Sequence, residues 1–533
     1  MSYSLSVIIL SGPIGSGKTT LAEELTRRYD AAHISTSGLI LMSAGGRLTR
    51  RELQKLSLDA SFQGGQWLAN ALTQVVRSAP SQRVIVVDAV RTFEQVQALR
   101  RTAAGAWHIL HAHLFADDRQ LADRYHARAR LEDSGVTWSQ AMKAPGEATI
   151  QALEVEADLV IDTTWVTPAD VAVRVGSRIS FARSHRTPCV DVLVGGQWGS
   201  EGKGNLAFSL APEYDLLVRV GAPNAGHKVH GYDGIIYTHR QLPSGTRAAT
   251  APLLLGAGAV LDVSVLLREI ADCQVSPERL TIDPNALIIE TDDVASEAAV
   301  KQSIGSTGTG GGAAVARRIM QRGVPGAVRT AKDVPELSPY VRDSAELLEQ
   351  AYARGASILI EGTQGTSLSI LHGSFPHVTS RDTTVGTLLS EVGVPPQRLR
   401  RVVVAFRAYP IRVGGPSGPM GREITWETVA QRAGLRLEEL RAAELGSVSQ
   451  KERRVAEFSW VQLETSARLN GATDIALTFA DHIDARNRQA RRLEQLTDYT
   501  IHFIQEVEWV TGSPVSLIST NFDGRGLIDR RQW

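Results

Sequence analysis

Two glycine-rich turns, each lying between an aliphatic run and a helical pattern, constrain this chain more than any other feature. The first is Gly12-Pro13-Ile14-Gly15-Ser16-Gly17-Lys18-Thr19, which fits G-x-x-x-x-G-K-[ST] at every position. It follows the run Val7–Leu10 and precedes helical spacing at Leu21–Leu25. Glycines in such a turn let backbone N–H groups surround a phosphate at the positive end of a helix. This segment, the first phosphate loop, therefore predicts a nucleotide site.

The side chains of the first phosphate loop have distinct expected parts. Gly12, Gly15 and Gly17 shape the loop. Lys18 is expected to reach the outer phosphates of a nucleotide, and the Thr19 hydroxyl to bind Mg²⁺. Asp88 ends the aliphatic run Val84–Val87 and is a candidate partner of that Mg²⁺, with an ordinary strand-end cap as the alternative.

Alternating patterns predict an α/β fold with two domains. Val84–Val87 and Leu159–Ile161 are buried-strand candidates between helical segments, which indicates a mainly parallel sheet flanked by helices. Residues 176–188 are polar and weakly periodic and are expected to form a linker. A fresh strand, Val190–Val194, follows. We expect domains at 1–175 and 189–533, each with such a sheet.

Two sets of side chains in the first domain stay open to more than one interpretation. Arg124, Arg128 and Arg130 recur at helical spacing, which suits either a lid over transferring phosphates or a solvated basic face. His111 and His113 share one face of a predicted strand. No carboxylate completes a ligand set with them, which favours structural histidines over a metal site.

Composition excludes several classes of protein. Fifty-seven basic and 57 acidic residues give zero formal net charge, which argues against binding nucleic acid by bulk electrostatics. Two cysteines exclude a disulfide scaffold. The first residues lack the pattern of a signal peptide, and the most apolar stretch is broken by glycines and Asp262. We expect a soluble cytoplasmic protein without a membrane partner.

The first 165 residues or so resemble nucleoside-monophosphate kinases of the P-loop class. The resemblance rests on the first phosphate loop, on Ile34–Gly38 and Val87–Arg91, and on the arginine-rich helical segment. It implies a nucleotide kinase whose phosphate acceptor stays open.

The second glycine-rich turn opens the larger domain. Residues 195–205, here the second phosphate loop, read Gly-Gly-Gln-Trp-Gly-Ser-Glu-Gly-Lys-Gly-Asn. No glycine stands five residues before Gly202-Lys203, so the pattern of the first loop is not met. Five glycines and a lysine at a strand-to-helix turn nevertheless suit close backbone approach to phosphate.

Further motifs follow the second phosphate loop in a fixed order. They are Asn224-Ala225-Gly226-His227, Ile304–Gly310, Glu361–Thr366, Gly373–Ser380 and Gly446–Ser449 with Arg453-Arg454. In order and spacing this series resembles adenylosuccinate synthetase, from about residue 190 to the C-terminus. The resemblance implies a carbon–nitrogen ligase that phosphorylates the 6-oxygen of a 6-oxopurine nucleotide and then lets the amine of L-aspartate displace the phosphate.

The resemblance also implies roles for individual residues. His227 matches the catalytic histidine, Gly226 a carbonyl ligand of Mg²⁺, and Gln364 a residue that holds the purine nucleotide. Arg322 falls where an arginine crosses a homodimer interface to the nucleotide, so a homodimer is the expected assembly. The remaining implied site residues are Gly199, Glu201, Gly202, Lys203 and Gly204 for the phosphate loop, Asn224, Thr307 and Thr379 for the purine nucleotide, and Ser447, Val448, Ser449 and Arg453 for aspartate.

Ser200 departs from the family pattern, which has aspartate at this position as base for N1 of the purine and as Mg²⁺ ligand. A serine hydroxyl holds no negative charge at neutral pH, so neither role carries over intact. A smaller neutral side chain leaves room beside C2, where guanine bears an amino group and hypoxanthine does not. The motif Gly199–Gly204 resembles that of the phage branch of the family that makes 2-aminoadenine. This resemblance favours GMP or dGMP as the substrate of this chain.

Two further departures concern the phosphoryl donor. The guanine-reading Thr-Lys-x-Asp of the family appears here as Thr478-Phe479-Ala480-Asp481, and Asn521-Phe522 replaces a Gly-Pro. Loss of the lysine favours ATP or dATP over GTP, with adenine stacking on Phe479 and Asp481 beside it. A purely structural Phe479 is the alternative.

Three functions remain open at this stage. The favoured one is a fused enzyme, a nucleotide kinase followed by a ligase that uses GMP or dGMP. An IMP-using ligase is the second. A ligase-like domain that binds nucleotides and regulates the kinase is the third, against which the retained His227, Lys203 and Gln364 speak.

Overall fold

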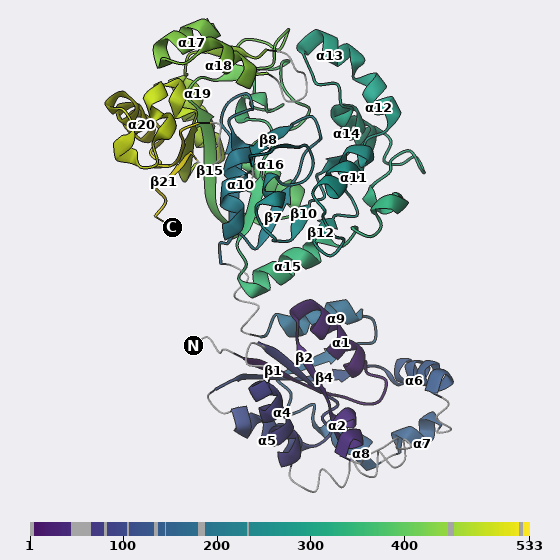
Figure 1. Ribbon diagram of the computed structural model, residues 1–533. Helices are drawn as coiled ribbons and strands as arrows, with labels where there is room; N and C mark the ends of the chain where they lie inside the picture. Colours follow the sequence, from purple (N-terminus) through teal and green to yellow (C-terminus); the bar gives the residue numbers. More distant parts are fainter. Residues whose placement is uncertain are drawn as a thin grey trace. The chain divides into compact units, whose positions relative to one another are not determined.

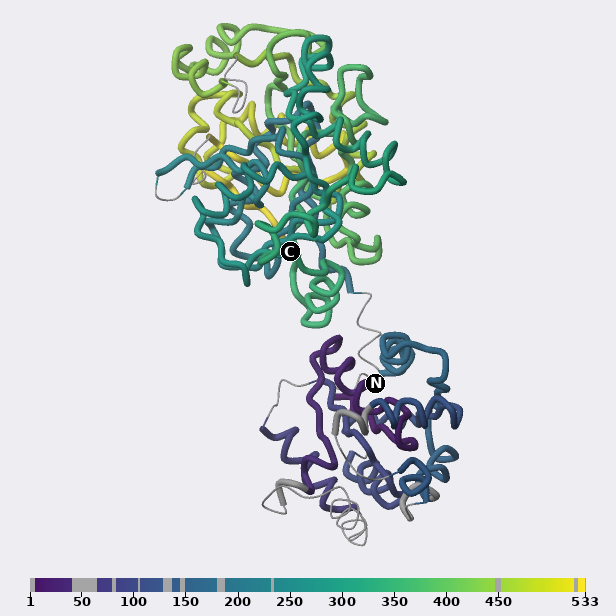
Figure 2. The backbone as a smooth tube through the Cα atoms, turned by 90° about the vertical axis from the view of Figure 1, so that its right-hand side faces the viewer, coloured from purple at the N-terminus to yellow at the C-terminus, as the bar shows by residue number. Residues whose placement is uncertain are grey.

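The chain folds into two compact units, Met1–Arg186 and Thr187–Trp533. The computed structural model describes residues 5–43, 65–78, 83–103, 106–132, 137–143, 145–179, 187–231, 234–445, 452–521 and 526–532. Each unit is built from one continuous stretch of chain (Figure 2). The division falls within residues 176–188, although the helix before it still includes Gly176. Within the described ranges, no helix has both the length and the apolar character that crossing a bilayer requires.

The first unit is a parallel sheet of order β2-β3-β1-β4-β5 with helices on both faces (Figure 1), as the sequence predicts. Its strands are β1 Ser6–Ser11, β2 Ala32–Ser35, β3 Val84–Asp88, β4 His108–Phe115 and β5 Leu159–Asp162. Its helices are α1 Lys18–Tyr29, α2 Thr36–Ser43, α4 Gln66–Ser78, α5 Phe93–Ala103, α6 Asp118–Glu132, α7 Trp138–Met142, α8 Pro145–Ala152 and α9 Pro168–Gly176.

The aliphatic residues of β1 supply both faces of this sheet. Ile8 and Leu10 pack in a core with α1 and α9, whereas Val7 and Ile9 pack in a core with α4 and α5. All six residues of β1 are buried. A strand covered on both faces reads as a continuous apolar run, which is why the sequence reveals it.

The second unit contains a nine-stranded sheet of order β12-β10-β7-β14-β6-β15-β19-β20-β21. Its pairs are parallel except β20 with β21, which form an antiparallel edge. The strands are β6 Val190–Gly195, β7 Leu216–Arg219, β10 Leu253–Leu255, β12 Leu280–Ile282, β14 Ile358–Glu361, β15 Leu399–Arg407, β19 Asp474–Thr478, β20 Val515–Ser519 and β21 Leu527–Asp529.

Helices cover both faces of this sheet as well (Figure 1). One core holds side chains of α15, α16, α19 and α20, and the other holds side chains of α10 and α11. The helices are α10 Lys203–Leu210, α11 Val263–Asp272, α12 Thr291–Ser296, α13 Ala298–Ile304, α14 Gly311–Met320, α15 Ser344–Arg354, α16 Val385–Val392, α17 Trp426–Ala433, α18 Leu437–Ala443, α19 Trp460–Asn470 and α20 Asp498–Thr511.

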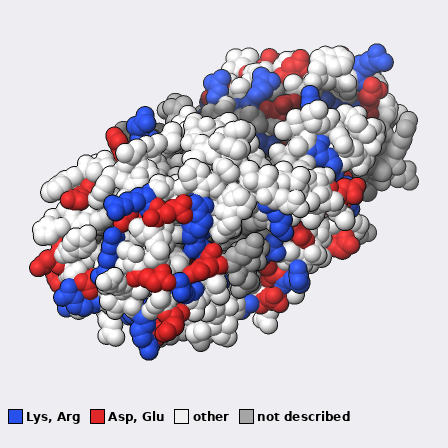
Figure 3. Space-filling view, turned by 90° about the horizontal axis from the view of Figure 1, so that it is seen from above, with Lys and Arg blue, Asp and Glu red and all other residues white. Residues whose placement is uncertain are grey.

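Small sheets extend the second unit beyond its large sheet. β8 (His227–His230) and β9 (Ile236–His239) form an antiparallel pair, β11 (Val260–Leu261) pairs with β13 (Leu287–Ile288), and β16 (Ile411–Arg412), β18 (Arg454–Ala456) and β17 (Glu423–Ile424) form a third sheet. Basic and acidic side chains lie next to one another on the face shown in Figure 3, in keeping with the zero formal net charge.

Parallel strands place their carboxyl ends at one edge of a sheet. In the second unit the neighbours β7, β14, β6, β15 and β19 end there, and the loops after them contain most of the motifs found in the sequence. Ligands of open α/β sheets bind at this edge. The fold therefore gathers segments that are far apart in sequence into one candidate site.

Candidate active sites

The first phosphate loop joins β1 to α1, as the sequence predicts. Gly17 precedes α1 with a φ of 92°, in the left-handed region that glycine adopts without strain. A Cβ added to Gly12 would lie 2.1 Å from the Leu114 carbonyl oxygen of β4, so only glycine permits this approach. Gly15 likewise lies against the backbone of Leu121 in α6.

Lys18, Thr19 and Asp88 meet at this loop. The Lys18 Nζ donates to the carbonyl oxygens of Gly12 and Pro13, both at 2.8 Å. The Thr19 Oγ1 donates to Asp88 Oδ2 at 3.0 Å. Asp88 is 3% exposed, and within the described ranges its Oδ1 has no hydrogen-bond partner. A buried carboxylate with an unused oxygen beside a hydroxyl is a donor set that fits Mg²⁺.

The arginine-rich helix α6 contacts the first phosphate loop through Arg124. Its guanidinium donates to the carbonyl oxygens of Thr163 at 2.7 Å and of Gly15 at 3.4 Å. The side chains of Arg128 and Arg130 lie outside the described residues. His111 and His113 both hydrogen-bond Ser11 Oγ, at 2.7 and 2.9 Å, so they share a face as predicted. No metal-holding group of three or more His, Cys, Asp or Glu occurs among the described residues.

The second phosphate loop is braced by Glu201. Its carboxylate accepts from the backbone N–H of Gln197 at 3.1 Å and of Gly199 at 2.8 Å, and from Lys203 Nζ at 2.6 Å. Both charged side chains are buried. The carboxylate of Glu201 therefore shapes the predicted phosphate loop and holds the Lys203 ammonium. Gly202, with a φ of 80°, precedes α10.

Two further residues of this loop have distinct surroundings. Ser200 is exposed and has a φ of 57°, and its carbonyl oxygen lies 3.5 Å from Arg407 Nη1. A Cβ added to Gly204 would lie 2.9 Å from the Cβ of His227. The glycine thus lets β8 and its histidine lie directly against the start of α10.

His227 forms a dyad with Glu361, a residue to which the sequence assigned no role. The His227 Nδ1 hydrogen-bonds Glu361 Oε1 across 134 residues of chain. Ser244 donates to the same carboxylate from its Oγ at 2.5 Å and from its backbone N at 2.7 Å. Arg219 Nη1 lies 3.7 Å from it. Glu361 and Arg219 are register partners at the ends of β14 and β7.

Electrostatics keep the dyad in one protonation state. Burial and the nearby Arg219 guanidinium lower the pKa of His227 to about 4, against the opposing effect of Glu361. Burial alone would raise the pKa of Glu361, but Arg219 and His227 lower it to about 2. At neutral pH the imidazole is neutral and donates from Nδ1, which leaves Nε2 as an acceptor.

Three residues predicted to hold a purine nucleotide are hydrogen-bonded to one another. The Gln364 Nε2 donates to Asn224 Oδ1 at 3.1 Å and to Thr379 Oγ1 at 3.2 Å. Gln364 follows β14 with a φ of 60°. Gly226 lies between Asn224 and His227 at the entry to β8. The structure thus joins the Asn224, Gln364 and Thr379 motifs at the edge of the sheet.

The remaining nucleotide residues are less closely tied to this cluster. Thr307 lies between α13 and α14, and the start of α14 lies against Ser380, next to Thr379. The Glu297 carboxylate accepts from the N–H groups of Gly310 and Gly312, so a side chain caps the helix end that the glycine pattern offers to a phosphate. Arg322 is exposed, with Nη1 donating to the Ile319 carbonyl at 2.5 Å.

The predicted aspartate residues are described in part. Ser447, Val448 and Ser449 lie outside the described residues. Arg453 is described, and its Nη1 donates to the buried Glu444 Oε2 at 3.2 Å.

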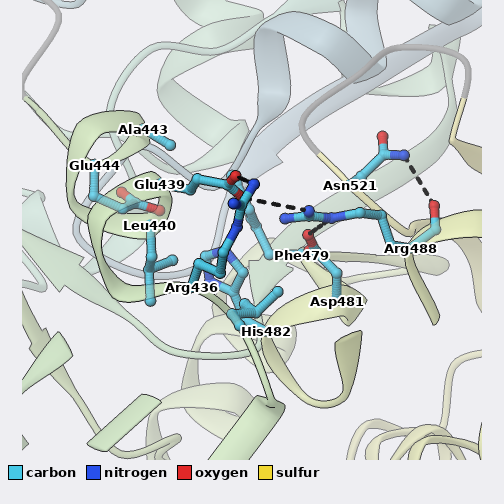
Figure 4. Close-up of a pocket in the computed structure, with 11 residues that line it drawn as sticks. Arg436, Glu439, Leu440, Ala443, Glu444, Phe479, Asp481, His482, Arg488 and Asn521 are labelled. Carbon is cyan, nitrogen blue, oxygen red and sulfur yellow. Dashed lines mark hydrogen bonds and ion pairs between the residues drawn. The ribbon is translucent and has the colours of Figure 1, made fainter. Parts of the chain in front are cut away.

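A pocket of about 260 Å³ lies beside Phe479 and Asp481 (Figure 4). α18 and the turn after β19 contribute most of its wall, and Arg488 and Asn521 complete it. Phe479 is 5% exposed, and Arg407 covers its ring at 4.1 Å from the centroid. Phe479 is thus part of the interior and also part of the pocket wall, and stacking of adenine on its ring stays a prediction. Phe522 lies outside the described residues.

Asp481 is a buried carboxylate of this pocket whose pKa departs from its ordinary value. Its Oδ2 lies 3.4 Å from Arg488 Nε, and within the described ranges its buried Oδ1 has no hydrogen-bond partner. Burial raises the pKa of Asp481 to about 6, against the opposing effect of Arg488. A buried carboxylate with one unused oxygen in a pocket is suited to accept a hydrogen bond from a ligand N–H.

The sequence patterns predict no role for several residues of these sites. Arg219, Glu361 and Arg407 each end a buried strand with a charged side chain, and Glu444 directly follows α18. A charge directly after an aliphatic run is the signal that would have identified the first three, because such runs end at the ligand-binding edge of a parallel sheet.

Two family models match the chain. One described as adenylosuccinate synthetase matches residues 192–330 and 326–488, and one described as an AAA domain matches residues 7–144. The adenylosuccinate synthetase of Thermococcus onnurineus is 39% identical over 348 residues, which cover 64% of this chain and 98% of that protein. That of Methanocaldococcus jannaschii is 37% identical over 350 residues, covering 64% and 96%.

Solved structures are similar to the second unit. The succinoaminodeoxyadenylate synthetase of cyanophage S-2L, bound to dGMP and dATP as an energy donor, is 28% identical with a TM-score of 0.54, over 65% of this chain and 96% of that chain. The fully ligated adenylosuccinate synthetase from Plasmodium falciparum shares the fold, with a TM-score of 0.57 at 19% identity over 64% and 100% of the two chains.

Proposed function

Because this chain belongs to the adenylosuccinate synthetase family and carries a kinase-like P-loop domain ahead of the synthetase domain, we propose that it joins L-aspartate to C6 of GMP or dGMP. The product is an N6-succino-2-aminoadenylate. A nucleoside triphosphate first phosphorylates the 6-oxygen, and the aspartate amine then displaces that phosphate.

Ser200 carries the choice of purine. It is an exposed, neutral side chain in the second phosphate loop, at the position of the family's aspartate. An aspartate beside N1 and C2 would crowd the 2-amino group of guanine, whereas a serine is shorter and its hydroxyl oxygen can accept from that group. The cyanophage synthetase, solved with dGMP, supports the same choice.

The dyad of His227 and Glu361 supplies proton control at the 6-oxygen. Glu361 orients the imidazole through Nδ1 and leaves Nε2 for the substrate oxygen. As negative charge develops on that oxygen and its phosphate, the pKa of His227 rises from its low resting value, so the ring takes up on Nε2 the proton that N1 of the purine releases, and its positive charge stabilises the oxygen and the phosphate. Lys203, held by Glu201, places a positive charge at the phosphates.

Mg²⁺ and the donor nucleotide complete the proposal. Mg²⁺ neutralises phosphate charge when bound; Gly226 and Ser200 offer it one carbonyl and one hydroxyl in the synthetase unit, both neutral oxygens suited to this ion. ATP or dATP is the proposed donor, with its adenine in the pocket of Phe479 and Asp481. The Asp481 carboxylate accepts from the 6-amino group of adenine in this arrangement.

We also propose that the first unit is a nucleotide kinase. Lys18 and Arg124 supply the positive charge that phosphoryl transfer needs, and Thr19 and Asp88 would hold Mg²⁺. The homodimer with Arg322 at its interface, and a cytoplasmic location, remain predictions.

One experiment tests substrate and donor together. The purified chain is incubated with L-aspartate, Mg²⁺ and each pairing of ATP, dATP or GTP with IMP, GMP or dGMP, and the products are identified by mass spectrometry. We expect aspartate adducts of GMP or dGMP with ATP or dATP. Adducts of IMP alone would overturn the assignment of purine, and no adduct with any pairing would overturn the ligase.

A further inference from the structure

Glu444 is a buried carboxylate shared by two arginines that lie at different parts of the synthetase site. It is 2% exposed and directly follows α18. Its Oε1 accepts from Arg407 Nη2 at 2.5 Å, while its Oε2 lies 3.4 Å from Arg407 Nη1 and accepts from Arg453 Nη1 at 3.2 Å. One carboxylate thus fixes the orientation of both guanidiniums.

Arg407 connects Glu444 to the donor side of the site. Its guanidinium is fully buried and lies over the Phe479 ring. Phe479 lines the pocket proposed above for the donor nucleotide, here the donor pocket, and Glu444 is part of the same wall. Its Nη1 also lies 3.5 Å from the Ser200 carbonyl oxygen of the second phosphate loop. A nucleotide that binds in the pocket therefore meets a wall that Arg407 and Glu444 hold together.

Arg453 connects Glu444 to the aspartate side. It belongs to the motif that resembles the aspartate-binding loop, Gly446–Ser449 with Arg453-Arg454. Lys228, next to His227, interacts electrostatically with Arg453 and Glu444. Burial and Arg453 lower the pKa of Lys228, and Glu444 raises it. Lys228, Arg407 and Arg453 carry three positive charges, against the carboxylates of Glu444 and of Asp481, which lies in the field of Arg407. The remaining positive charge suits an anionic ligand such as aspartate.

We propose that Glu444 is a positioning residue that aligns Arg453 for a carboxylate of aspartate and couples this arginine to the donor pocket. The inference rests on the proposed function. Donor binding orders the pocket wall at Phe479, Arg407 lies over that ring and holds Glu444 by two contacts, and Glu444 holds Arg453. Ordering one side pre-orders the other, so donor and aspartate bind with positive cooperativity.

The test is the affinity for aspartate of the full chain, measured by calorimetry with dGMP and Mg²⁺ present. Each protein is titrated with and without a non-hydrolysable ATP analogue. In the wild type we expect the analogue to tighten aspartate binding several-fold. In Glu444→Gln we expect aspartate binding to weaken about tenfold or more, as loss of a hydrogen bond to a charged group predicts. The effect of the analogue should disappear, and dGMP binding should stay within about twofold of wild type.

A second variant guards against misfolding. Glu444→Asp keeps the charge beside Arg407 on a shorter side chain, and we expect it to fold and to restore part of the cooperativity. Glu457→Gln is the matched control. Glu457 directly follows β18, the strand that begins next to Arg453, and forms an ion pair with Arg432 at 2.8 Å near the surface. It should behave as wild type.

The outcomes separate this inference from the function on which it rests. Retained cooperativity in Glu444→Gln, or equal weakening of dGMP, aspartate and analogue, would overturn the positioning role while the ligase stands. A wild-type chain that binds no aspartate under any condition and forms no adduct would overturn the proposed function, and the inference with it.

Discussion

Replacing Glu361 by glutamine tests whether this carboxylate must orient the imidazole of His227, because the histidine itself is kept. The substitution keeps the size of the side chain. It also keeps one oxygen for the Ser244 backbone N–H, which in the wild-type protein donates to the carboxylate at 2.7 Å. The new amide NH₂ meets the Nδ1–H of His227, so two donors face each other. The ring must then move its proton to Nε2, where the proposed chemistry needs an acceptor.

The structure sets the size of this effect. The bond lost is a buried hydrogen bond to a charged group, worth about 1.5–3 kcal/mol, which corresponds to a fall of ~10–150-fold in kcat. Arg219 also loses its carboxylate neighbour at 3.7 Å. It keeps the carbonyl oxygens of Leu242 at 2.9 Å and Ala225 at 3.0 Å, so we expect unfolding to become easier by ~3 kcal/mol or less.

The assay is the initial rate of aspartate-dependent release of nucleoside diphosphate, with denaturant unfolding of the same preparations. We expect kcat to fall while KM for aspartate and for the purine nucleotide changes less than about threefold, because Glu361 acts through His227. Glu290→Gln, which removes an exposed partner of Arg329, is the control. A folded Glu361→Gln protein with kcat within about twofold of wild type would refute the role of the dyad.

Three further predictions address the purine, the donor and the kinase. Ser200→Asp should fold, since aspartate tolerates a φ of 57°, and should shift the kcat/KM ratio toward IMP by ~10-fold or more; an unchanged ratio would detach this position from base selection. Asp481→Asn should weaken donor binding yet stabilise the fold at pH 8. The folded-state pKa of Asp481 is about 6, above the ordinary 3.8, so the charged carboxylate that is present above pH 6 destabilises the folded protein. The gain should reach ~3 kcal/mol at most at pH 8 and vanish near pH 4, as seen by chemical unfolding; equal stability at pH 8 would contradict it. Lys18→Met should lower phosphoryl transfer by the first unit ~100-fold or more and leave aspartate-dependent turnover unchanged, and a parallel loss of both would contradict two separate sites.

Local patterns in the sequence were enough to predict both sheets and both phosphate loops. β1, β3 and β6 are buried on two faces and appear as aliphatic runs, which only Asp191 interrupts in β6, so their positions agree with the structure within one residue. The pattern G-x-x-x-x-G-K-[ST] fixes the place of Lys18 and Thr19 because the backbone geometry is local. The resemblance to a family then located Asn224, Gln364 and Thr379, which the structure joins by hydrogen bonds.

Contacts between distant segments could not be predicted. The dyad joins His227 to Glu361 across 134 residues, and Arg407 meets Glu444 across 37, so no local spacing signals either pair. The surroundings of Glu201 could not be predicted either. The glycine-rich loop folds back and presents its own N–H groups to this carboxylate, and a role of Glu201 toward a nucleotide stays a prediction.

A direct competition between dGMP and IMP tests the central claim, that the Ser200 loop makes this synthetase a guanine-nucleotide enzyme. Equal concentrations of both nucleotides are mixed with ATP, Mg²⁺ and L-aspartate, and the ratio of the two adducts at low conversion gives the ratio of kcat/KM values. The account predicts that the dGMP adduct predominates by ~10-fold or more. Predominance of the IMP adduct would contradict it.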